Sequence, residues 1–434
     1  MSITPNNAQF VILSFEGPDR YSQAGGLGTR VTELARALAQ AGFTTHLIFI
    51  GDPSLPSVET TECGNLHLYR WCQWISHAHP TGAYEAEWDK LIDYANSVPW
   101  FVTDRIVRPA ADQGQITVVM AEEWHTTETL ARLSDSLHFN GLRQECVLLW
   151  NANNEFGFGH IDLPRLDFIA TITTVSRFMK HRLWDWGLNP LVLPNGIPRR
   201  LLEKVPQQPV RRLRRGMAAD FLLLKMGRFD PDKRWLQAIE AAGQLKHAGH
   251  RVRFIARGGL EPHGGDVLHR AAEMGLVVQD IYSDNSNLEG ALDAILAASD
   301  HADVLNLCDF VPEALQRVFY SAVDAVLANS GYEPFGLVGL EAMACGAVVV
   351  TGTTGEDYAV QLHNALSVET DDPAELASYL QLVHSQPDVI KQIKRHARQT
   401  AALFTWDSTI RDLVGKVEYL AAKQGIDVQS NPNG

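Results

Sequence analysis

Two glutamates, Glu333 and Glu341, lie in the segment EPFGLVGLEAMACG with seven residues between them. The segment predicts a turn followed by a helix from Gly336 to Cys345, with Gly346 as a typical C-terminal stop. The start of such a helix offers unpaired backbone N–H groups and a positive dipole end, which suit a phosphate. Carboxylates beside it can accept hydrogen bonds from sugar hydroxyls, although both residues are equally typical of an ordinary loop and helix surface.

A second group of chemically active residues lies in KMGRFDPDKR, residues 225–234, where a predicted strand leads into a loop. Arg228 and Lys233 could converge there on one anion, although two cations near a turn are more often simply solvated. A diphosphate leaving group gains negative charge as its bond breaks, so fixed cations would lower the barrier. Asp230 and Asp232 have the letters of an Asp-x-Asp metal motif, but we interpret them as loop residues and predict no metal site.

Two further segments follow predicted strands of the N-terminal half. Gly25, Gly26 and Gly28 would let a ligand approach the backbone at a helix N-terminus, although such a turn is weak evidence alone. Their spacing is not the dinucleotide-binding G-x-G-x-x-G, which argues against a nicotinamide dehydrogenase. His125, in MAEEWHTT, lies at the expected carboxyl end of another strand. A lone histidine is usually structural, and His160 is the competing candidate.

Strand and helix patterns alternate along almost the whole chain, which predicts parallel sheets with crossover helices. The first strand is expected over residues 10–15 and the first helix over 29–40, and several prolines mark a linker near 196–210. Ligands of such sheets bind outside the carboxyl ends of the strands, so a cleft between two domains is the expected site. The predicted parts are an N-terminal domain (1–198), a C-terminal domain (206–404), a helix that packs back onto the first domain (405–424) and a disordered tail (425–434).

Composition narrows the class of protein. The 434 residues are 45% hydrophobic, which fits globular domains with substantial cores. The absence of a long apolar run or a signal segment, together with scattered cysteines, predicts a cytoplasmic protein without an integral membrane segment. The net charge of −14 argues against nucleic acid as a partner. Arginines between residues 199 and 215 are interpreted as a solvated linker and helix face rather than a patch for anionic lipid, and the sequence leaves a homo-oligomer open.

The segment from Glu333 to Glu341 resembles the E-x7-E signature of retaining GT-B glycosyltransferases, most closely family 4, the glycosyl transferases group 1. The G-R-x4-K pattern that contains Arg228 and Lys233 is similar to the diphosphate clamp of that family. Residues 174–197 resemble the end of its first domain and residues 404–420 its final helix. The likeness therefore covers nearly the whole chain, and it is weakest over residues 51–115.

The resemblance implies an α/β GT-B fold, with two Rossmann-like doubly wound domains facing a central cleft. Glu341 would bind the ribose of the nucleotide, Glu333 would lie at the donor sugar, and Arg228 and Lys233 would neutralise the leaving diphosphate without an obligatory metal. The backbone around Gly336 would approach the sugar and phosphates, through Phe335, Gly336 and Leu337.

Some features are similar to glycogen and starch synthases in particular. The Trp124-His125 pair resembles their D-W-H segment, in which the histidine lies near the donor sugar. The loop with Gly25, Gly26 and Gly28 would face the donor phosphates and the acceptor. Those synthases carry K-x-G-G at this point, whereas this chain has Gln23 in place of the lysine, which weakens a glucan synthase assignment.

The implied function is that of a retaining glycosyltransferase. It would move a hexose from a nucleotide-diphosphate sugar to a hydroxyl of a sugar, glycan or small polyol. UDP-glucose is the default donor, and ADP-glucose and GDP-mannose stay open. One alternative is a GT-B nucleotide-sugar epimerase, which would need no acceptor, and another is a non-catalytic sugar-binding protein on the same fold.

Overall fold

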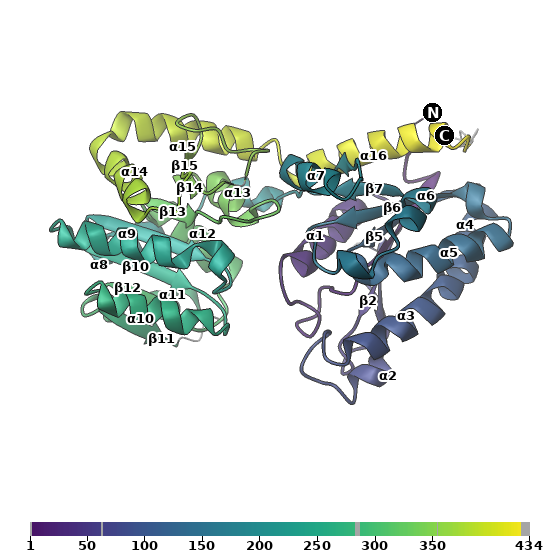
Figure 1. The fold of residues 1–434 in the computed structure, drawn as a ribbon, viewed down its shortest axis with the longest axis horizontal. Helices are drawn as coiled ribbons and strands as arrows, with labels where there is room; N and C mark the ends of the chain where they lie inside the picture. The colour runs from purple at the N-terminus through teal and green to yellow at the C-terminus, as the bar shows by residue number, and fades with distance from the viewer. Residues whose placement is uncertain (1, 62–63, 283–286, 354, 427–434) are drawn as a thin grey trace. The chain divides into compact units, whose positions relative to one another are not determined.

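The computed structural model describes residues 2–61, 64–282, 287–353 and 355–426. The chain forms two compact units: unit 1 combines Met1–Gly196 with Trp406–Gly434, and unit 2 is Ile197–Thr405 (Figure 1). Each unit is a largely parallel sheet with helices packed against it, as the alternation of strand and helix patterns predicts. From residue 427 onward, the tail expected to be disordered lies outside the described residues.

Unit 1 is built on an eight-stranded sheet in the order β3-β4-β2-β1-β5-β6-β7-β8. Neighbouring strands run parallel, except that β3 is antiparallel to β4. The chain starts at a central strand and winds outward on both sides, which is the doubly wound pattern. The strands are β1 (Ala8–Leu13), β2 (Thr45–Ile50), β3 (Val58–Thr60), β4 (Leu66–Trp71), β5 (Ile116–Glu122), β6 (Cys146–Ala152), β7 (Thr171–Thr174) and β8 (Leu191–Val192).

Helices α1 and α16 share one hydrophobic core with alternate residues of the central strands, such as Phe10, Leu47 and Val118. Helices α3 and α5 pack against each other, and α3 buries Tyr94 and Val98 completely. The helices of unit 1 are α1 (Gly26–Gln40), α2 (Gln73–Ser76), α3 (Glu87–Phe101), α4 (Arg108–Ala111), α5 (Thr127–Phe139), α6 (Leu163–Ile169), α7 (Arg177–Trp184) and α16 (Trp406–Lys423). Single turns occur at η1 (Val102–Val107), η2 (Trp124–Thr126), η3 (Arg143–Glu145) and η4 (Phe158–His160).

Unit 2 contains a seven-stranded sheet in the order β11-β12-β10-β9-β13-β14-β15. Each neighbouring pair runs parallel, so the carboxyl ends of the strands lie at one edge. Phe221, Leu223 and Phe254 point into a core shared with α9, α10 and α14. The strands are β9 (Phe221–Met226), β10 (Val252–Arg257), β11 (Val278–Ile281), β12 (Val304–Leu307), β13 (Ala325–Ala328), β14 (Val349–Thr351) and β15 (Leu366–Ser367).

The region expected to be a linker is partly helical. A short turn precedes α8, and Pro209 lies in the first turn of this helix, where a missing N–H costs nothing. Two arginines of α8 are paired with acids of neighbouring elements, Arg212 with Glu289 and Asp293, and Arg214 with Asp324. The helices of unit 2 are η5 (Arg199–Leu202), α8 (Gln207–Met217), η6 (Pro231–Lys233), α9 (Trp235–His247), α10 (His263–Glu273), α11 (Leu288–Ser299), α12 (Glu313–Ala322), α13 (Leu337–Ala344), α14 (Pro373–Ser385) and α15 (Pro387–Ala401).

Among the residues that the structure describes, every helix is too short or too polar to cross a bilayer.

The final helix is held to unit 1 at its first residue. Gly196 lies so close to α16 that an added Cβ would stand 2.7 Å from the Cα of Trp406. From there, Ile410, Leu413 and Val417 continue along the buried face of the helix. A glycine is therefore required at position 196, because backbone cannot move away as a flexible side chain could.

We predict that Gly196→Ala destabilises unit 1 by roughly 1–3 kcal/mol, because the new methyl group collides with the α16 backbone. Gly415→Ala is the matched control within α16, where an added Cβ meets nothing within 4 Å. That variant should stabilise the protein by about 0.5–1 kcal/mol, since alanine favours a helix interior. Thermal unfolding of both variants checks this, and equal melting temperatures would contradict it.

Candidate functional site

In unit 2, the loops after β9 and β13 lie side by side because these strands are neighbours in the sheet. The N–H of Gly331 donates to the carbonyl of Asp232 at 2.8 Å, which joins the two loops through their backbones. Beside this bond, the Lys233 ammonium forms an ion pair with the Glu333 carboxylate. The structure thus brings together two predicted site residues that are 100 positions apart in the chain.

The loop after β9 holds its shape through its own polar groups. The Asp230 carboxylate accepts the N–H of Asp232 at 2.9 Å and caps the turn over Pro231–Lys233. Arg234 then adopts a left-handed conformation (φ 51°) and pairs with Asp371, so it points to a different partner from Lys233. Arg228 is exposed at the start of the loop. Within the described ranges, His, Cys, Asp and Glu side chains form no group of three that could hold a metal ion.

A buried lysine that the sequence analysis did not single out lies beneath this loop. Lys225 is 2% exposed and donates to the carbonyl of Leu327 at 3.1 Å and to Asn329 Oδ1 at 2.5 Å. Burial lowers its pKa well below the usual range, and the nearby Lys233 lowers it further. Asn329 in turn donates to Gln237 at 2.8 Å. The only signal in the sequence is a lysine within the apolar strand FLLLKM.

The start of α13 is shaped by a glycine that no other residue could replace easily. Gly336 has a φ of 80°, and an added Cβ would stand 2.7 Å from the Tyr358 hydroxyl. That hydroxyl donates to the Gly336 carbonyl at 2.6 Å. Phe335 is buried and packs edge-on against the Tyr358 ring, and Leu337 begins the helix one residue after the predicted start. The backbone turn expected at this point is therefore fixed from below by Tyr358.

Glu341 lies on α13 itself, more than a turn after its first residue. Its carboxylate accepts the hydroxyl of Tyr320, from α12, at 3.2 Å. Burial raises the pKa of Tyr320, and the Glu341 charge raises it further, so the phenol stays protonated as a donor. Glu341 is half-buried.

In unit 1, the glycine segment differs from the expected arrangement. Helix α1 begins at Gly26, three residues before the predicted start, so Gly26 and Gly28 belong to its first turn. One oxygen of Glu16 accepts the N–H groups of Gly25 and Gly28 at 3.1 and 2.9 Å. A phosphate expected at this helix start would meet a carboxylate already bound to these donors.

Glu16 also explains part of the glycine pattern. An added Cβ at Gly28 would stand 3.0 Å from its carboxylate, whereas Gly25 and Gly26 face open space. The second Glu16 oxygen accepts the hydroxyl of Tyr84 at 2.7 Å. Gly28 therefore leaves room for the cap, and Gly25 donates its N–H to it, while the space around Gly25 and Gly26 stays open. Nothing in the sequence indicated this cap beyond an acid three residues after the end of β1.

His125 lies in the single turn η2 directly after β5 and is 6% exposed. Its Nε2 is 2.7 Å from a carboxylate oxygen of Glu87, the first residue of α3, and its ring stacks on Phe15 at 4.5 Å. Its Nδ1 is buried and has no hydrogen-bond partner among the described residues. Because the ring proton is on Nε2, where it faces the carboxylate, Nδ1 has a lone pair that can accept a hydrogen bond from a hydroxyl group.

The pKa of His125 is lowered, chiefly because the ring is buried, and the Glu87 carboxylate opposes this shift only in part. The imidazole is therefore neutral near pH 7, as a hydrogen-bond acceptor must be. His160, the competing candidate, instead contacts the rings of Trp88 and Trp124. The structure thus gives His125 a buried, unsatisfied nitrogen, whereas His160 is exposed.

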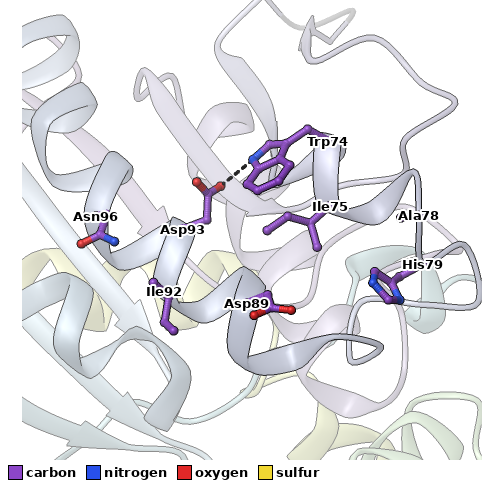
Figure 2. Close-up of a pocket in the computed structure, with 8 residues that line it drawn as sticks. All are labelled: Trp74, Ile75, Ala78, His79, Asp89, Ile92, Asp93 and Asn96. Atoms are coloured by element: carbon purple, nitrogen blue, oxygen red, sulfur yellow. Dashed lines mark hydrogen bonds between the residues drawn. The ribbon is translucent and has the colours of Figure 1, made fainter.

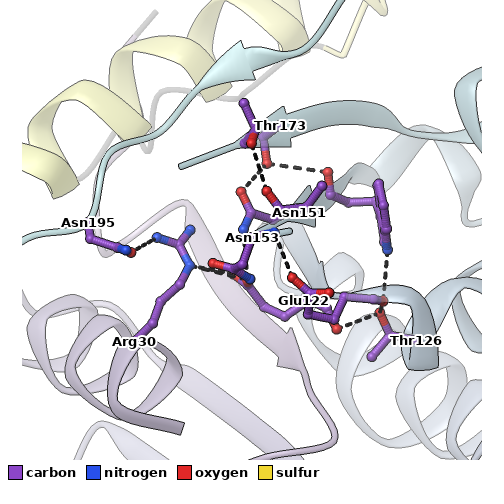
Figure 3. A network of polar contacts seen from close by, with 11 residues as sticks. Arg30, Glu122, Thr126, Asn151, Asn153, Thr173 and Asn195 are labelled. Atoms are coloured by element: carbon purple, nitrogen blue, oxygen red, sulfur yellow. Dashed lines mark hydrogen bonds and ion pairs between the residues drawn. The ribbon is translucent and has the colours of Figure 1, made fainter. Parts of the chain in front are cut away.

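A buried ion pair lies close to the carboxyl ends of β5 and β6 (Figure 3). Arg30 and Glu122 are 2% and 0% exposed, and the nearest charged atoms are 3.2 Å apart. Asn151 and Asn153 donate to the same carboxylate at 2.9 and 3.0 Å, and Arg30 also donates to Asn195. A buried ion pair is tolerated when further hydrogen bonds satisfy its oxygens, as these amides do.

The next residue, Glu123, has a different environment. Glu123 is buried, and no cation among the described residues forms an ion pair with it. The backbone N–H of Asn153 donates to its carboxyl group at 2.6 Å. Burial raises its pKa to about 8. Its backbone has a φ of 67°, which is rare and strained for a residue with a side chain. Glu123 is thus held as a protonated acid at neutral pH, next to Glu122, which is paired with Arg30.

Comparison with known proteins adds to this geometry. Residues 217–400 match the family described as glycosyl transferases group 1. A glycogen synthase of Mycobacterium tuberculosis is 31% identical over 421 residues, which is 96% of this chain and 81% of the relative. A D-inositol 3-phosphate glycosyltransferase of Geodermatophilus obscurus is 29% identical over 323 residues, 72% of this chain. The match spans 65% of that relative, just under two thirds of its length.

The solved structures share the fold. Anabaena HepE, determined in complex with UDP, superposes with a TM-score of 0.62 at 15% sequence identity, over 95% of this chain and all of that one. The predicted GT-B fold class is therefore confirmed, as two parallel-sheet α/β units built on this pattern.

We predict that Glu123→Gln stabilises the protein at alkaline pH. The folded state keeps a proton on Glu123 up to a pKa of about 8, whereas the unfolded chain loses it near 4.5. The stabilising contribution of the buried acid is therefore complete below pH 4.5 and lost as the pH rises toward 8. Glutamine mimics the protonated form at all pH values, so the variant should gain at least about 1 kcal/mol over wild type at pH 8 and nothing at pH 4.5.

Denaturant unfolding at several pH values measures this difference. Glu122→Gln is the matched control and should be destabilised by roughly 3–5 kcal/mol, because it leaves Arg30 buried without a counter-charge. A Glu123→Gln variant that loses stability at every pH would show that Glu123 is buried as an anion.

We also predict that His125 titrates below pH 6.5 and carries its neutral proton on Nε2, which nitrogen-15 NMR of the imidazole can measure. Glu87→Gln should lower the pKa of His125 further, because the carboxylate charge that raises it is gone. Glu85→Gln is the control: it changes a partly exposed acid two residues before Glu87 and should leave the pKa of His125 unchanged. A proton on Nδ1 would contradict the arrangement.

Proposed function

The chain belongs to the glycosyl transferases group 1 family, and on this premise we propose that it transfers a hexose from a nucleotide-diphosphate sugar to a hydroxyl of an acceptor. The contact between Lys233 and Glu333, at the start of α13, carries the proposal. It places a cation and a carboxylate where a parallel sheet binds its ligands, at the carboxyl ends of the strands. A cation suits the diphosphate of such a donor, and a carboxylate suits its sugar hydroxyls.

Each group of unit 2 has a proposed role toward the donor. Arg228 and Lys233 hold the diphosphate, together with the N–H groups and positive dipole end at Leu337. Glu333 accepts hydrogen bonds from hydroxyls of the sugar, and Glu341 does the same for the ribose. Lys233 is paired with Glu333, and the approach of a diphosphate would give this ammonium a stronger anion to neutralise.

The proposed reaction breaks the bond between the anomeric carbon and the diphosphate oxygen, and it forms a bond from that carbon to the acceptor oxygen. The diphosphate leaves with the bonding electrons, and the acceptor proton passes to a phosphate oxygen. Fixed cations stabilise the charge that grows on the leaving group without having to reorganise. We propose that the anomeric configuration is retained, as the E-x7-E pattern implies.

In unit 1, the imidazole of His125 is the hydrogen-bond acceptor that we assign to a substrate hydroxyl. Nδ1 of His125 is buried, neutral and unsatisfied, which suits the hydroxyl of a sugar. Glu87 orients this ring from the opposite side. Gly25 and Gly26 face open space beside the Glu16 cap, so a ligand can come close to this backbone, although the N–H of Gly25 is already bonded to Glu16.

UDP-glucose is the donor we propose first, and the UDP bound to Anabaena HepE, a protein of the same fold, is in line with this choice. ADP-glucose and GDP-mannose are the other candidates. A thermal-shift series with UDP, ADP and GDP and their sugars separates them, because a ligand of the folded state raises its stability by mass action. A shift of the same size for all three nucleotides, or for none, would overturn the choice.

We predict that Glu341→Ala weakens nucleotide binding by about tenfold, the loss of one charge-assisted hydrogen bond. Lys233→Ala should lower turnover by roughly 100-fold or more, because a preorganised charge at the leaving group is removed. Calorimetry measures the first, and release of nucleoside diphosphate in the presence of an acceptor measures the second.

Lys246→Ala is the control for the loss of a lysine. Lys246 lies on α9, and its ammonium is paired with Asp303 at 2.6 Å. This variant should keep wild-type turnover. Unchanged turnover in Lys233→Ala would remove Lys233 from the leaving-group site. Conversion of the nucleotide sugar without any acceptor would instead indicate an isomerase, and no reaction with any donor would leave only sugar binding.

A further inference from the structure

A pocket of about 430 Å³ lies in unit 1 between α2 and α3 (Figure 2). From α3 it is lined by Asp89, Ile92, Asp93 and Asn96, which recur every three or four residues and share one face of the helix. Trp74 lines it from α2. The volume is within the range of small-molecule sites, and nothing proposed above for donor or acceptor uses these residues.

Trp74 has the exposure and the fixed orientation of a binding platform. Its side chain is 72% exposed, which is unusual for a residue of this size next to the buried Ile75. The indole N–H donates to Asp93 Oδ2 at 3.3 Å, as Figure 2 shows. Because its polar edge already has a partner, what the ring still offers to a ligand is its apolar face.

The other side chains of the pocket are hydrogen-bonding groups suited to hydroxyls. The carboxylates of Asp89 and Asp93 can accept hydrogen bonds, and neither Lys nor Arg is among the described residues that line the pocket. The side-chain oxygen of Asn96 accepts a hydrogen bond from Arg132, so the side-chain N–H₂ is the group that can donate to a ligand. Two negative charges disfavour a phosphate or a carboxylate. A sugar ring, with an apolar face and a rim of hydroxyls, matches all of these groups.

Helix α3 connects this pocket to His125. Its first residue, Glu87, holds His125, and Asp93 follows about 9 Å further along the helix axis. On its buried face, Lys90 donates to the Tyr21 hydroxyl at 2.7 Å, and that hydroxyl donates to the carbonyl of His79 at 2.8 Å. His79 is part of the pocket wall. The pocket and the proposed acceptor side of unit 1 therefore share one rigid element.

We propose that this pocket binds a neutral sugar unit of an extended carbohydrate acceptor, stacked on Trp74 and hydrogen-bonded to Asp89, Asp93 and Asn96. The inference rests on the proposed function for the identity of the ligand as an acceptor, but the binding itself needs neither donor nor turnover. A cationic ligand would also meet an aromatic ring and carboxylates. Sites for such cations enclose the ligand between several aromatic rings, whereas Trp74 offers a single ring. The connection to His125 through α3 also favours the sugar.

The test is calorimetric titration of the full chain, without nucleotide, with the neutral oligosaccharides maltoheptaose, cellohexaose and mannohexaose, and with choline as the cation. We expect at least one oligosaccharide to bind. Trp74→Ala should weaken that binding roughly tenfold, the loss of one aromatic contact, while Trp74→Phe should retain most of it. Trp100→Ala is the matched control, because Trp100 is also exposed on α3 (58%) but does not line the pocket.

Binding of none of the oligosaccharides, equal weakening by Trp100→Ala, or binding of choline alone would overturn the proposal. With an active donor, Trp74→Ala should raise the KM for the long acceptor by a similar factor and leave kcat and nucleotide affinity unchanged. Oligosaccharide binding that depends on Trp74 in a protein without transfer activity would support the pocket and refute the proposed function. Transfer activity that changes neither with the Trp74→Ala substitution nor with the length of the acceptor would support the proposed function and refute the pocket.

Discussion

The ion pair between Lys233 and Glu333 depends on the parallel pairing of β9 with β13. Parallel neighbours end at the same edge of a sheet, so loops that are far apart in the chain meet there. One backbone hydrogen bond, from Gly331 to Asp232, then fixes how these loops meet. Lys225 and Asn329 support the same junction from the buried side. The position of the Lys233–Glu333 pair is thus a consequence of strand order, and the buried Lys225 and Asn329 hold the two loops in place.

Unit 1 handles charge in a different way, by neutralising it inside the protein. Arg30 and Glu122 cancel each other in a buried pair, Glu123 keeps its proton, and Glu16 is held by backbone N–H groups. Burial of an isolated charge would cost several kcal/mol, and each of these arrangements avoids that cost by a different route. Several buried polar atoms of unit 1 have no hydrogen-bond partner among the described residues, and Nδ1 of His125 is the imidazole nitrogen among them, which can accept a hydrogen bond from a ligand.

Helix α3 combines several of these roles on different faces. Its N-terminus orients His125, its buried face anchors the loop that contains Tyr21, and its outer face lines the pocket beside Trp74. The region from residue 51 to 115 resembled the family least in sequence, yet it contains this helix. The helix that lines this pocket therefore lies in the part of the chain that the family resemblance describes least.

The sequence by itself predicted the alternating α/β architecture, the loop that contains Arg228 and Lys233, and the helix that follows Glu333, because these follow from local periodicity and short motifs. It could not show Glu16 capping α1, Glu87 holding His125 or Lys225 beneath the loop, since each partner is distant in the chain. The early start of α1 at Gly26 has the same cause, the carboxylate of Glu16 from the loop after β1, which accepts the N–H groups of Gly25 and Gly28. Local pattern determines which elements form, whereas burial and pairing between distant residues decide which polar groups are satisfied and which are left to bind a ligand.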